Sequence, residues 1–353
     1  MYAVVRNLNG VSLIWIAPFI VADEDDEKLV DSSIEHHFLK LTEPWLLCGA
    51  PTILLNRLCY APLLAAVKRR LGSGDVLLAG SGGTGKAQFQ ALLCKDLLTE
   101  GRTVVVDLQD GAYWCLKSGT EPRRGIRGHE TQGFAEELGL KTSVYLYGAR
   151  KVPGGDSRST LAPLEVAART VVSASPSRGG LSLDEWSNKR SGRLARKLYM
   201  PPWSLDELHA LRSLDERFRG VEPALVDQMF DLFGGKVRYT LVDLLPDDVR
   251  GSTDEEVEHL RDMIEEGIGK CDAREMMAYL KSKSALTSKL DHVVHGLFTL
   301  VPRENYRKFS YSFCSRYVQD EVLKRMTDES RVCVYEPLGN INRALGEFML
   351  PVC

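Results

Sequence analysis

The chain lacks the cysteine and histidine patterns of metal sites and disulfide frameworks. Its eight cysteines include no C-x-x-C pair and no Cys/His spacing typical of zinc, so we predict no metal site of that kind. Several cysteines stand inside apolar segments, as buried thiols do, and this usage favours a reducing compartment over a disulfide scaffold. The histidines at 36, 37, 292 and 295 have no evident third ligand. We interpret them as core or surface residues.

Long apolar runs and a charge excess are also missing. No stretch approaches the roughly 18 to 20 apolar residues of a membrane span, so we predict no membrane partner. The formal charge is −3 over 353 residues, so net charge does not indicate a nucleic-acid partner. The basic run at residues 189–197 fits a nuclear-import address or a phosphate-binding patch, although we favour a solvated helix or loop. No G-x-S-x-G elbow points to a nucleophilic triad.

The amino-terminal segment has two interpretations. Residues 2–5 and 11–16 are β-prone and flank Asn9-Gly10, a dipeptide that tolerates the positive φ of tight hairpin turns. We favour a β-hairpin on this ground. The alternative is that residues 11–22 form the apolar core of a secretory signal.

The most informative feature present is a glycine-rich octapeptide that matches the phosphate-binding pattern G-x-x-x-x-G-K-[ST] except at its last position. In that pattern backbone N–H groups cradle phosphates, the lysine neutralises the β/γ oxygens, and the final hydroxyl holds Mg²⁺. The candidate nucleotide-binding residues are Gly80, Ser81, Gly82, Gly83, Thr84, Gly85, Lys86 and Ala87. Ala87 has no hydroxyl, so the chain keeps the cradle and the lysine without the magnesium ligand.

The context of this octapeptide supports a phosphate loop over an ordinary glycine-rich turn. An apolar run at 75–79 predicts a buried strand before it. Apolar residues at helical spacing over 87–98, ended by Gly101, predict a helix after it. Strand-like runs at 102–108, 143–148 and 168–174 then alternate with other segments, which indicates a mostly parallel sheet covered by helices. The glycine- and proline-rich stretches 120–128 and 152–159 are predicted flexible insertions.

A nucleoside triphosphatase needs a carboxylate at a strand end to hold the metal. Asp107 directly follows a β-branched run, which makes it the first candidate. Its strand comes immediately after the loop helix, whereas in the larger ATPase classes the metal acid comes from a later strand. The later strand, 144–148, contains no acid. We therefore favour a structural strand-end or turn role for Asp107.

A helix start is predicted after the Pro201-Pro202-Trp203 turn. Ser204 has the character of an N-cap and Glu207 completes a capping box. We interpret this element as structural, with Trp203 packed beneath it.

Several segments together resemble the ATPase-like module of the Crinkler effectors, which are related to the retrotransposon hot spot proteins. Besides the octapeptide, the resemblance rests on residues 60–64, 68–71, 171–176, 198–208, 233–239 and 309–318. The resemblance runs from about residue 55 to about residue 330, and it rests on the order and spacing of these segments together. The resemblance implies an α/β fold: a P-loop core related to the AAA-type ATPases, with helices on both faces of the sheet, followed by a small helical lid.

The resemblance gives the domain organisation that we expect. Residues 1–55 form an amino-terminal segment with the hairpin, 56–180 the core, 181–245 the lid, and 246–353 an α+β segment closing the module. The family often carries a further carboxy-terminal effector domain, for which this chain leaves no room. We therefore expect the module alone, as in a shortened paralogue.

The resemblance also assigns roles to single residues. Lys86 would contact the nucleotide phosphates, and Arg238 would be the lid arginine that reaches toward them. The family's strand corresponding to 144–149 usually ends in Asp, where this chain has Gly148. Lys236-Val237 also departs from the family's lid turn. Ala87 and Gly148 together argue against a Mg²⁺ site, and no catalytic residue is assigned.

We therefore expect a Crinkler-like effector that binds ATP through the loop with weak or no hydrolysis, at best a poor ATPase. The alternative is a non-catalytic interaction protein that acts on a host protein and has no nucleotide function. By resemblance alone, the protein is secreted into a host cell and reaches the host nucleus. The family's delivery header is not evident, so an intracellular soluble protein is the alternative location.

Overall fold

The computed structural model describes the helices, strands and adjoining turns of the chain. These residues are 3–8, 11–15, 37–40, 53–107, 112–126, 134–149, 163–175, 195–245, 253–270 and 296–325. The chain divides into two compact units. The first contains Met1–Val76, Ala87–Gly148 and Pro163–Ser173, and the second contains Leu77–Lys86, Ala149–Ala162 and Ala174–Cys353.

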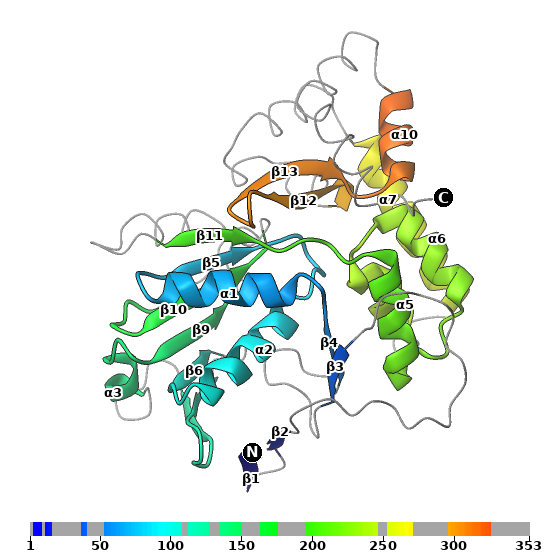
Figure 1. The fold of residues 1–353 in the computed structure, drawn as a ribbon. Coiled ribbons are helices and arrows are strands. Elements are labelled where there is room, and N and C mark those ends of the chain that lie inside the picture. The colour runs from blue at the N-terminus through cyan, green and yellow to red at the C-terminus, as the bar shows by residue number, and fades with distance from the viewer. Residues whose placement is uncertain are drawn as a thin grey trace. The chain divides into compact units, whose positions relative to one another are not determined.

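A seven-stranded sheet carries the fold (Figure 1). Its strand order is β11 (Arg196–Tyr199), β5 (Val76–Ala79), β10 (Arg169–Ala174), β9 (Val144–Gly148), β6 (Val104–Asp107), β7 (Ala112–Leu116) and β8 (Arg123–Ile126). β9 runs parallel to β6 and β10, while β7 is antiparallel to both β6 and β8. The α/β class and the mostly parallel sheet are thus confirmed. The placement of helices on both faces stays a prediction.

The parallel strands are the apolar runs that the sequence indicated. β5, β6, β9 and β10 lie within the predicted ranges 75–79, 102–108, 143–148 and 168–174. Val104 pairs with Val144, which in turn pairs with Arg169. Val104, Val105 and Val106 have no exposed surface. Such continuous apolar strands are typical of a parallel sheet buried on both faces.

The prediction of a flexible insertion at 120–128 is wrong where the chain forms β8. Ala112 pairs with Ile126 and Cys115 with Arg123 in an antiparallel hairpin. Gly119 adopts a φ of +74° in the connecting turn, a conformation that glycine reaches without steric cost. The tight turn therefore lies at Gly119, just before this stretch, and Gly125 within the stretch belongs to β8. Residues 152–159 lie outside the described part of the chain.

Helices α1 (Tyr60–Leu71) and α2 (Lys86–Thr99) pack against each other. The rings of Tyr60 and Phe89 meet edge to face at 5.4 Å, and Lys68 pairs with Asp96 at 2.7 Å. α2 confirms the helix predicted after the octapeptide. Gly101 follows it with a φ of +75°, as expected of a glycine beyond a helix end. The short helix α3 (Ala135–Leu138) completes the described helices of the first unit.

The amino-terminal hairpin prediction is confirmed for its strands. β1 (Ala3–Leu8) pairs antiparallel with β2 (Val11–Trp15). A second pair joins β3 (His37–Lys40) to β4 (Ile53–Asn56). His36, His292 and His295 lie outside the described residues. Among the helices that are described, none is long and apolar enough to cross a membrane.

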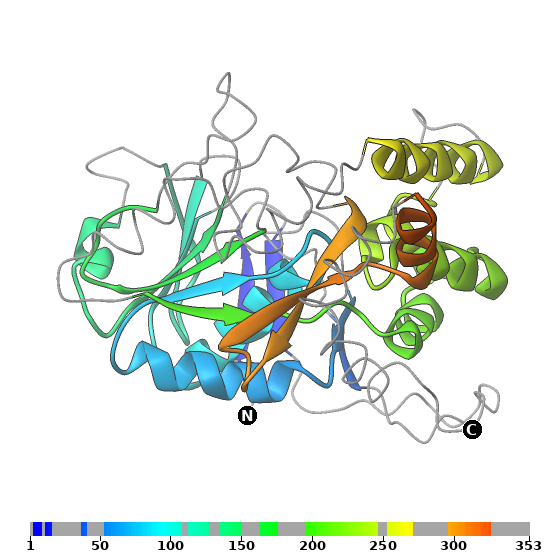
Figure 2. The ribbon, with the colours of Figure 1, turned by 90° about the horizontal axis from the view of Figure 1, so that it is seen from above.

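The second unit continues from β11 into helices and a carboxy-terminal hairpin (Figure 2). In chain order these are α5 (Leu205–Leu214), a 3₁₀ turn (Glu216–Phe218), α6 (Pro223–Phe233), a π-helical turn (Arg238–Val242), α7 (Thr253–Gly269), β12 (Phe298–Arg303), β13 (Lys308–Phe313) and α10 (Arg316–Lys324). β12 and β13 are antiparallel. Of the basic run 189–197, the described residues include Arg196 and Lys197, which begin β11.

The predicted capping box at the start of α5 is confirmed. The Glu207 N–H donates to Ser204 Oγ at 3.1 Å, and the Ser204 N–H donates to Glu207 Oε2 at 3.0 Å. Two backbone donors that a helix start leaves open are thereby satisfied. Trp203 is 1% exposed, as expected for a packed tryptophan. This cap fixes where the chain leaves β11 and enters the helical part of the unit.

Candidate functional site

Residues 80–86 connect β5 to α2 and adopt a conformation that needs glycine. Gly83 has a φ of +76° and Gly85 a φ of +84°, which residues with a Cβ rarely reach. The Thr84 hydroxyl is buried between them and donates to the Ser81 carbonyl at 2.9 Å. The glycines of the octapeptide therefore set a tight turn directly before the first turn of a helix.

The ammonium group of Lys86 folds back over this turn. Its Nζ donates to the carbonyl oxygens of Gly80 at 2.6 Å and Ser81 at 2.7 Å. A third contact reaches Thr84 Oγ1 at 3.4 Å. A half-buried positive charge thus lies inside the loop, beside the amides at the start of α2. Such an arrangement is suited to an anion, because helix amides and an ammonium group both attract negative charge.

One wall of the loop is built by β12, from the far end of the second unit. The Leu300 N–H donates to Ser81 Oγ at 3.1 Å, and Ser81 Oγ shares a further hydrogen bond of 3.2 Å with Thr299 Oγ1. Ser81 is only 5% exposed. No local sequence pattern indicates this contact, because the partners lie more than 200 residues apart. The segment 309–318, which the resemblance includes, contains most of β13, the partner strand of β12. The resemblance alone does not indicate that this hairpin contacts the loop.

Two further backbone contacts hold the loop in place. The Met200 N–H donates to the Ala79 carbonyl at 2.8 Å, and the Val237 N–H donates to the Gly83 carbonyl at 3.3 Å. A Cβ at Gly83 would lie 3.3 Å from the backbone nitrogen of Arg238. By contrast, a Cβ at Gly82 would meet nothing within 4 Å. The loop is therefore packed at Gly83 and open at Gly82.

Gly234 and Gly235 allow close backbone packing just before the chain reaches residues 80–86. A Cβ at Gly234 would lie 1.8 Å from the carbonyl oxygen of Cys314, and one at Gly235 would lie 1.9 Å from that of Trp203. The Trp203 N–H also donates to the Gly235 carbonyl at 3.0 Å. Only glycine permits both approaches. The next residues, 236–238, then run past Gly83.

Arg238 is exposed and begins the π-helical turn. Its backbone lies beside the loop, as the contact with Gly83 indicates. The direction of its guanidinium group toward bound phosphates stays a prediction. π-helical turns occur often at functional sites.

Lys236 has a structural role. It is 2% exposed, and its Nζ donates to the Gly296 carbonyl at 2.6 Å. Burial lowers the pKa of Lys236, and the neighbouring Cys314 thiol opposes this shift in part. The lysine thus ties the segment after Gly235 to the chain just before β12.

The residues present do not fit a magnesium ion. Ala87 offers a methyl group at the position of the expected hydroxyl, and Gly148 ends β9 without a side chain. Asp107 is 1% exposed and accepts a hydrogen bond of 2.6 Å from the Tyr145 hydroxyl, which supports its interpretation as a structural acid. In the part of the chain that the structure describes, no three His, Cys, Asp or Glu side chains gather as metal ligands.

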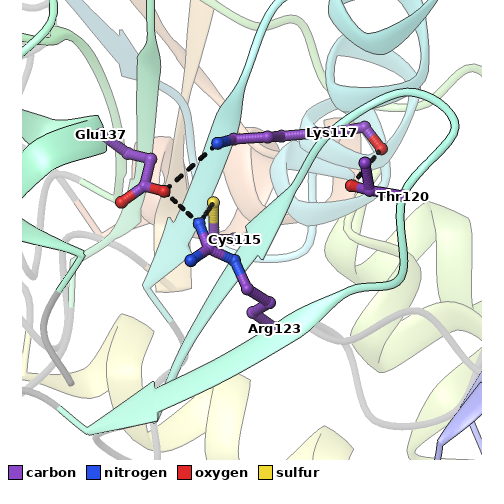
Figure 3. A network of polar contacts seen from close by, with 5 residues as sticks. All are labelled: Cys115, Lys117, Thr120, Arg123 and Glu137. Carbon is purple, nitrogen blue, oxygen red and sulfur yellow. Dashed lines mark hydrogen bonds and ion pairs between the residues drawn. The ribbon is translucent and has the colours of Figure 1, made fainter.

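A second polar cluster joins the β7–β8 hairpin to α3 (Figure 3). Glu137 of α3 accepts hydrogen bonds from Lys117 at 3.3 Å and from Arg123. Arg123 also contacts the buried Cys115 thiol at 3.5 Å. Burial raises the pKa of Glu137, but the hydrogen bonds from Arg123 and Lys117 outweigh it, so the pKa lies below its ordinary value. The cluster ties α3 to the hairpin, which is a structural task.

Comparison with known proteins gave no further assignment. No protein-family model matches the chain, and no curated protein matches it significantly. The likeness to the Crinkler module therefore rests on the sequence segments themselves.

Proposed function

We propose that this protein is a Crinkler-like effector module with a P-loop fold, which binds ATP through residues 80–86 and hydrolyses it weakly or not at all. The observation that carries the proposal is the backbone of the loop. Gly83 and Gly85 take positive φ values between a buried strand and a 14-residue helix, with the Lys86 ammonium group inside the turn. These are the parts that a phosphate cradle requires.

Phosphate binding needs one local rearrangement. The Lys86 Nζ leaves the carbonyls of Gly80 and Ser81 and donates to a phosphate oxygen. Charge-assisted hydrogen bonds of this kind are stronger than those to neutral carbonyls, so the exchange is favourable. The open side of the loop at Gly82 gives the phosphates access to the backbone amides.

Weak turnover follows from the two missing metal ligands. Without a hydroxyl at Ala87 and a carboxylate at Gly148, a magnesium ion has little to hold it against the phosphates. Phosphoryl transfer relies on that ion to neutralise developing charge. The loop amides and Lys86 bind phosphate without it, so binding and hydrolysis become separable in this chain.

A second candidate is an interaction protein with no nucleotide function. The observation that favours it is the hydrogen bonding of Lys86, whose ammonium group already has two short contacts to loop carbonyls. A loop satisfied in this way is stable without a ligand. The glycine-rich turn would then be a structural relic, and the surface would act on a host protein.

Calorimetric titration of the full chain with ATP, with magnesium and then with EDTA, separates the two candidates. We expect binding that does not need magnesium and that falls by about tenfold or more in Lys86→Ala, because a charged hydrogen-bond donor is lost. Lys95→Ala, further along α2, is the matched control and should bind as the wild type does. Absence of ATP binding supports the second candidate. Magnesium-dependent turnover near about 1 per second would contradict the degenerate site.

The resemblance extends the proposal to location. A protein of this kind would act inside host cells, in the nucleus, on a host protein. Expression of a fluorescently tagged chain in host cells, followed by microscopy, tests nuclear accumulation. A uniformly cytoplasmic signal contradicts this part of the proposal and leaves the ATP measurement untouched.

A further inference from the structure

Positive side chains gather where β11 meets the carboxy-terminal hairpin. We call this the basic hairpin surface, and it consists of Arg196, Lys197, Arg303, Arg307 and Lys308. All are exposed except Arg303, which is half-buried. The turn between the strands also holds one acid, Glu304, which is paired with Lys308 at 2.8 Å. A positive excess therefore remains on this surface although the whole chain is slightly acidic.

The hairpin turn is docked on β11, so the two sources of charge are neighbours (Figures 1 and 2). The Tyr199 N–H at the end of β11 donates to the Tyr306 carbonyl at 2.9 Å. The rings of Tyr199 and Phe309 lie 4.6 Å apart. Arg196 and Lys197 precede Tyr199 by only two or three residues, which is about 7 to 10 Å along a strand. The basic residues of β11 thus lie close along the strand to the residue that contacts the turn, with the side chains of Arg196 and Lys197 on alternate faces of the strand.

The turn itself has a strained and fixed backbone. Glu304, Asn305 and Tyr306 are three consecutive non-glycine residues with positive φ values, +46°, +55° and +67°. Each such residue costs about 1 kcal/mol or more. The conformation persists because the Tyr306 carbonyl is bound by β11 and the Arg307 N–H donates to the Arg303 carbonyl at 3.1 Å. Strain of this kind tends to be kept where it serves a function.

A side-chain contact orients Arg303 at the base of the turn. The Nε of Arg303 donates to Ser310 Oγ at 3.1 Å. In the β12–β13 register, Arg303 lies opposite Lys308. Arg303 therefore has its guanidinium stem fixed while its terminal nitrogens remain available for a further acceptor. Planar guanidinium groups bind phosphate oxygens in pairs, which suits a chain of phosphates better than an isolated ammonium group does.

We propose that the basic hairpin surface binds the phosphate backbone of single-stranded nucleic acid. Tyr306 and Phe309 are half-buried beside the arginines and offer ring surface on which unpaired bases can stack. The large exposed apolar side chains of the described residues are Leu58, Ile126, Leu140, Val242 and Met263. None belongs to this surface, which argues against insertion into a membrane. The surface needs no ATP, so the inference does not depend on the proposed function.

Fluorescence anisotropy of a labelled oligothymidylate of about 20 nucleotides, titrated with the full chain, tests the inference. We expect binding that weakens as salt rises. Arg303→Gln/Arg307→Gln and, separately, Arg196→Gln/Lys197→Gln should each weaken binding about tenfold and lower the salt slope by about 1.4, since each removes two phosphate contacts. Arg316→Gln/Lys324→Gln removes the same charge from α10 and should bind as the wild type does. Circular dichroism and thermal unfolding establish that each variant is folded.

Several results would overturn the inference. One is the absence of binding at about 100 μM protein in low salt, a concentration at which even non-specific complexes form. Another is equal loss of affinity in the α10 control, which would indicate a general charge effect. Equally tight binding to a duplex of the same length would contradict stacking on single strands. Binding to phosphatidylserine vesicles without binding to the oligonucleotide would assign the surface to membranes.

Discussion

Two glycine clusters of the second unit use the same residue for opposite purposes. In the loop, Gly82 has open space where a Cβ would lie, while Gly83 and Gly85 supply positive φ values. At Gly234 and Gly235 a Cβ would collide with the backbone oxygens of Cys314 and Trp203, at 1.8 and 1.9 Å. One cluster leaves its amides open to a ligand. The other removes side chains so that three segments can pack backbone to backbone.

The difference matters because the two clusters are linked. The Val237 N–H, two residues after Gly235, donates to the Gly83 carbonyl. Gly234 and Gly235 therefore position a segment that packs against residues 80–86. A substitution at Gly234 or Gly235 should therefore lower stability strongly, whereas one at the open position Gly82 should leave stability nearly unchanged. Variants that separate stability from binding test this division.

The largest effect is expected from Gly235→Ala. The added methyl group would lie 1.9 Å from the Trp203 carbonyl oxygen and 2.5 Å from its nitrogen, so the backbone must move. We expect a loss of about 4 kcal/mol or more in the free energy of unfolding, measured by urea denaturation. Gly82→Ala is the matched control and should change stability by about 0.5 kcal/mol or less. Equal stability of the two variants would remove the distinction between the clusters.

Ser81→Ala should have the next largest effect, because this residue belongs to the loop and yet has a packing role. The variant leaves the buried Leu300 N–H without its acceptor. An unsatisfied buried donor costs about 1 to 3 kcal/mol, so we expect destabilisation of that size in urea denaturation. ATP binding should persist, because the amides and Lys86 remain. Unchanged stability would show that the hairpin does not support the loop.

Ala87→Ser tests how the loop responds to magnesium. The new hydroxyl restores one metal ligand, so magnesium should raise ATP affinity by a few fold, about 1 kcal/mol or less. Hydrolysis should stay far below about 1 per second, because Gly148 still provides no carboxylate. Calorimetry with and without magnesium, together with a phosphate-release assay, measures both effects. Rapid turnover by this single variant would mean that another residue supplies the acid.

The smallest effect on stability is expected from the ion pairs of Glu137 with Lys117 and Arg123, which provide a comparison for the two glycine clusters. The pKa of Glu137 lies below the ordinary 4.5, so its charge stabilises the fold above pH 4.5, and this contribution is lost as pH falls through the lowered value. Glu137→Gln should cost about 1 kcal/mol or less at neutral pH, because the side chains of Lys117 and Arg123 are 41% and 53% exposed, and solvent screens their ion pairs with Glu137. It should also flatten the acid dependence of unfolding. Glu136→Gln, next to it and exposed, should retain the wild-type dependence.

Local sequence features were sufficient for several elements of the fold. Apolar runs located β5, β6, β9 and β10, and Ser204 with Glu207 located the start of α5. The Asn9-Gly10 dipeptide indicated the pairing of β1 with β2. The β7–β8 hairpin was missed because the glycines and proline of residues 120–128 also suit a loop, and Gly125 lies inside β8. Periodicity does not distinguish a tight turn from an insertion when the second strand is short and basic.

For the candidate site, too, the sequence indicates the residues but not all of their contacts. Its residues could be named from the sequence, because a glycine-rich turn between a strand and a helix has its own local pattern. The contacts of Ser81 with Thr299 and Leu300 could not, since they join positions more than 200 residues apart. The placement of Asp107 beneath the Tyr145 hydroxyl likewise depends on the order of the strands.

The sequence by itself determined the octapeptide with its lysine, and the absence of a hydroxyl at Ala87 and of a carboxylate at Gly148. These are properties of single residues and need no folding to be known. Only the tertiary structure decided that β12 forms a wall of the loop, that Gly235 lies against Trp203, and that basic residues of β11 and the hairpin turn share one surface. Such contacts are set by packing between distant segments, where the geometry of the backbone, and not local preference, decides which residues meet.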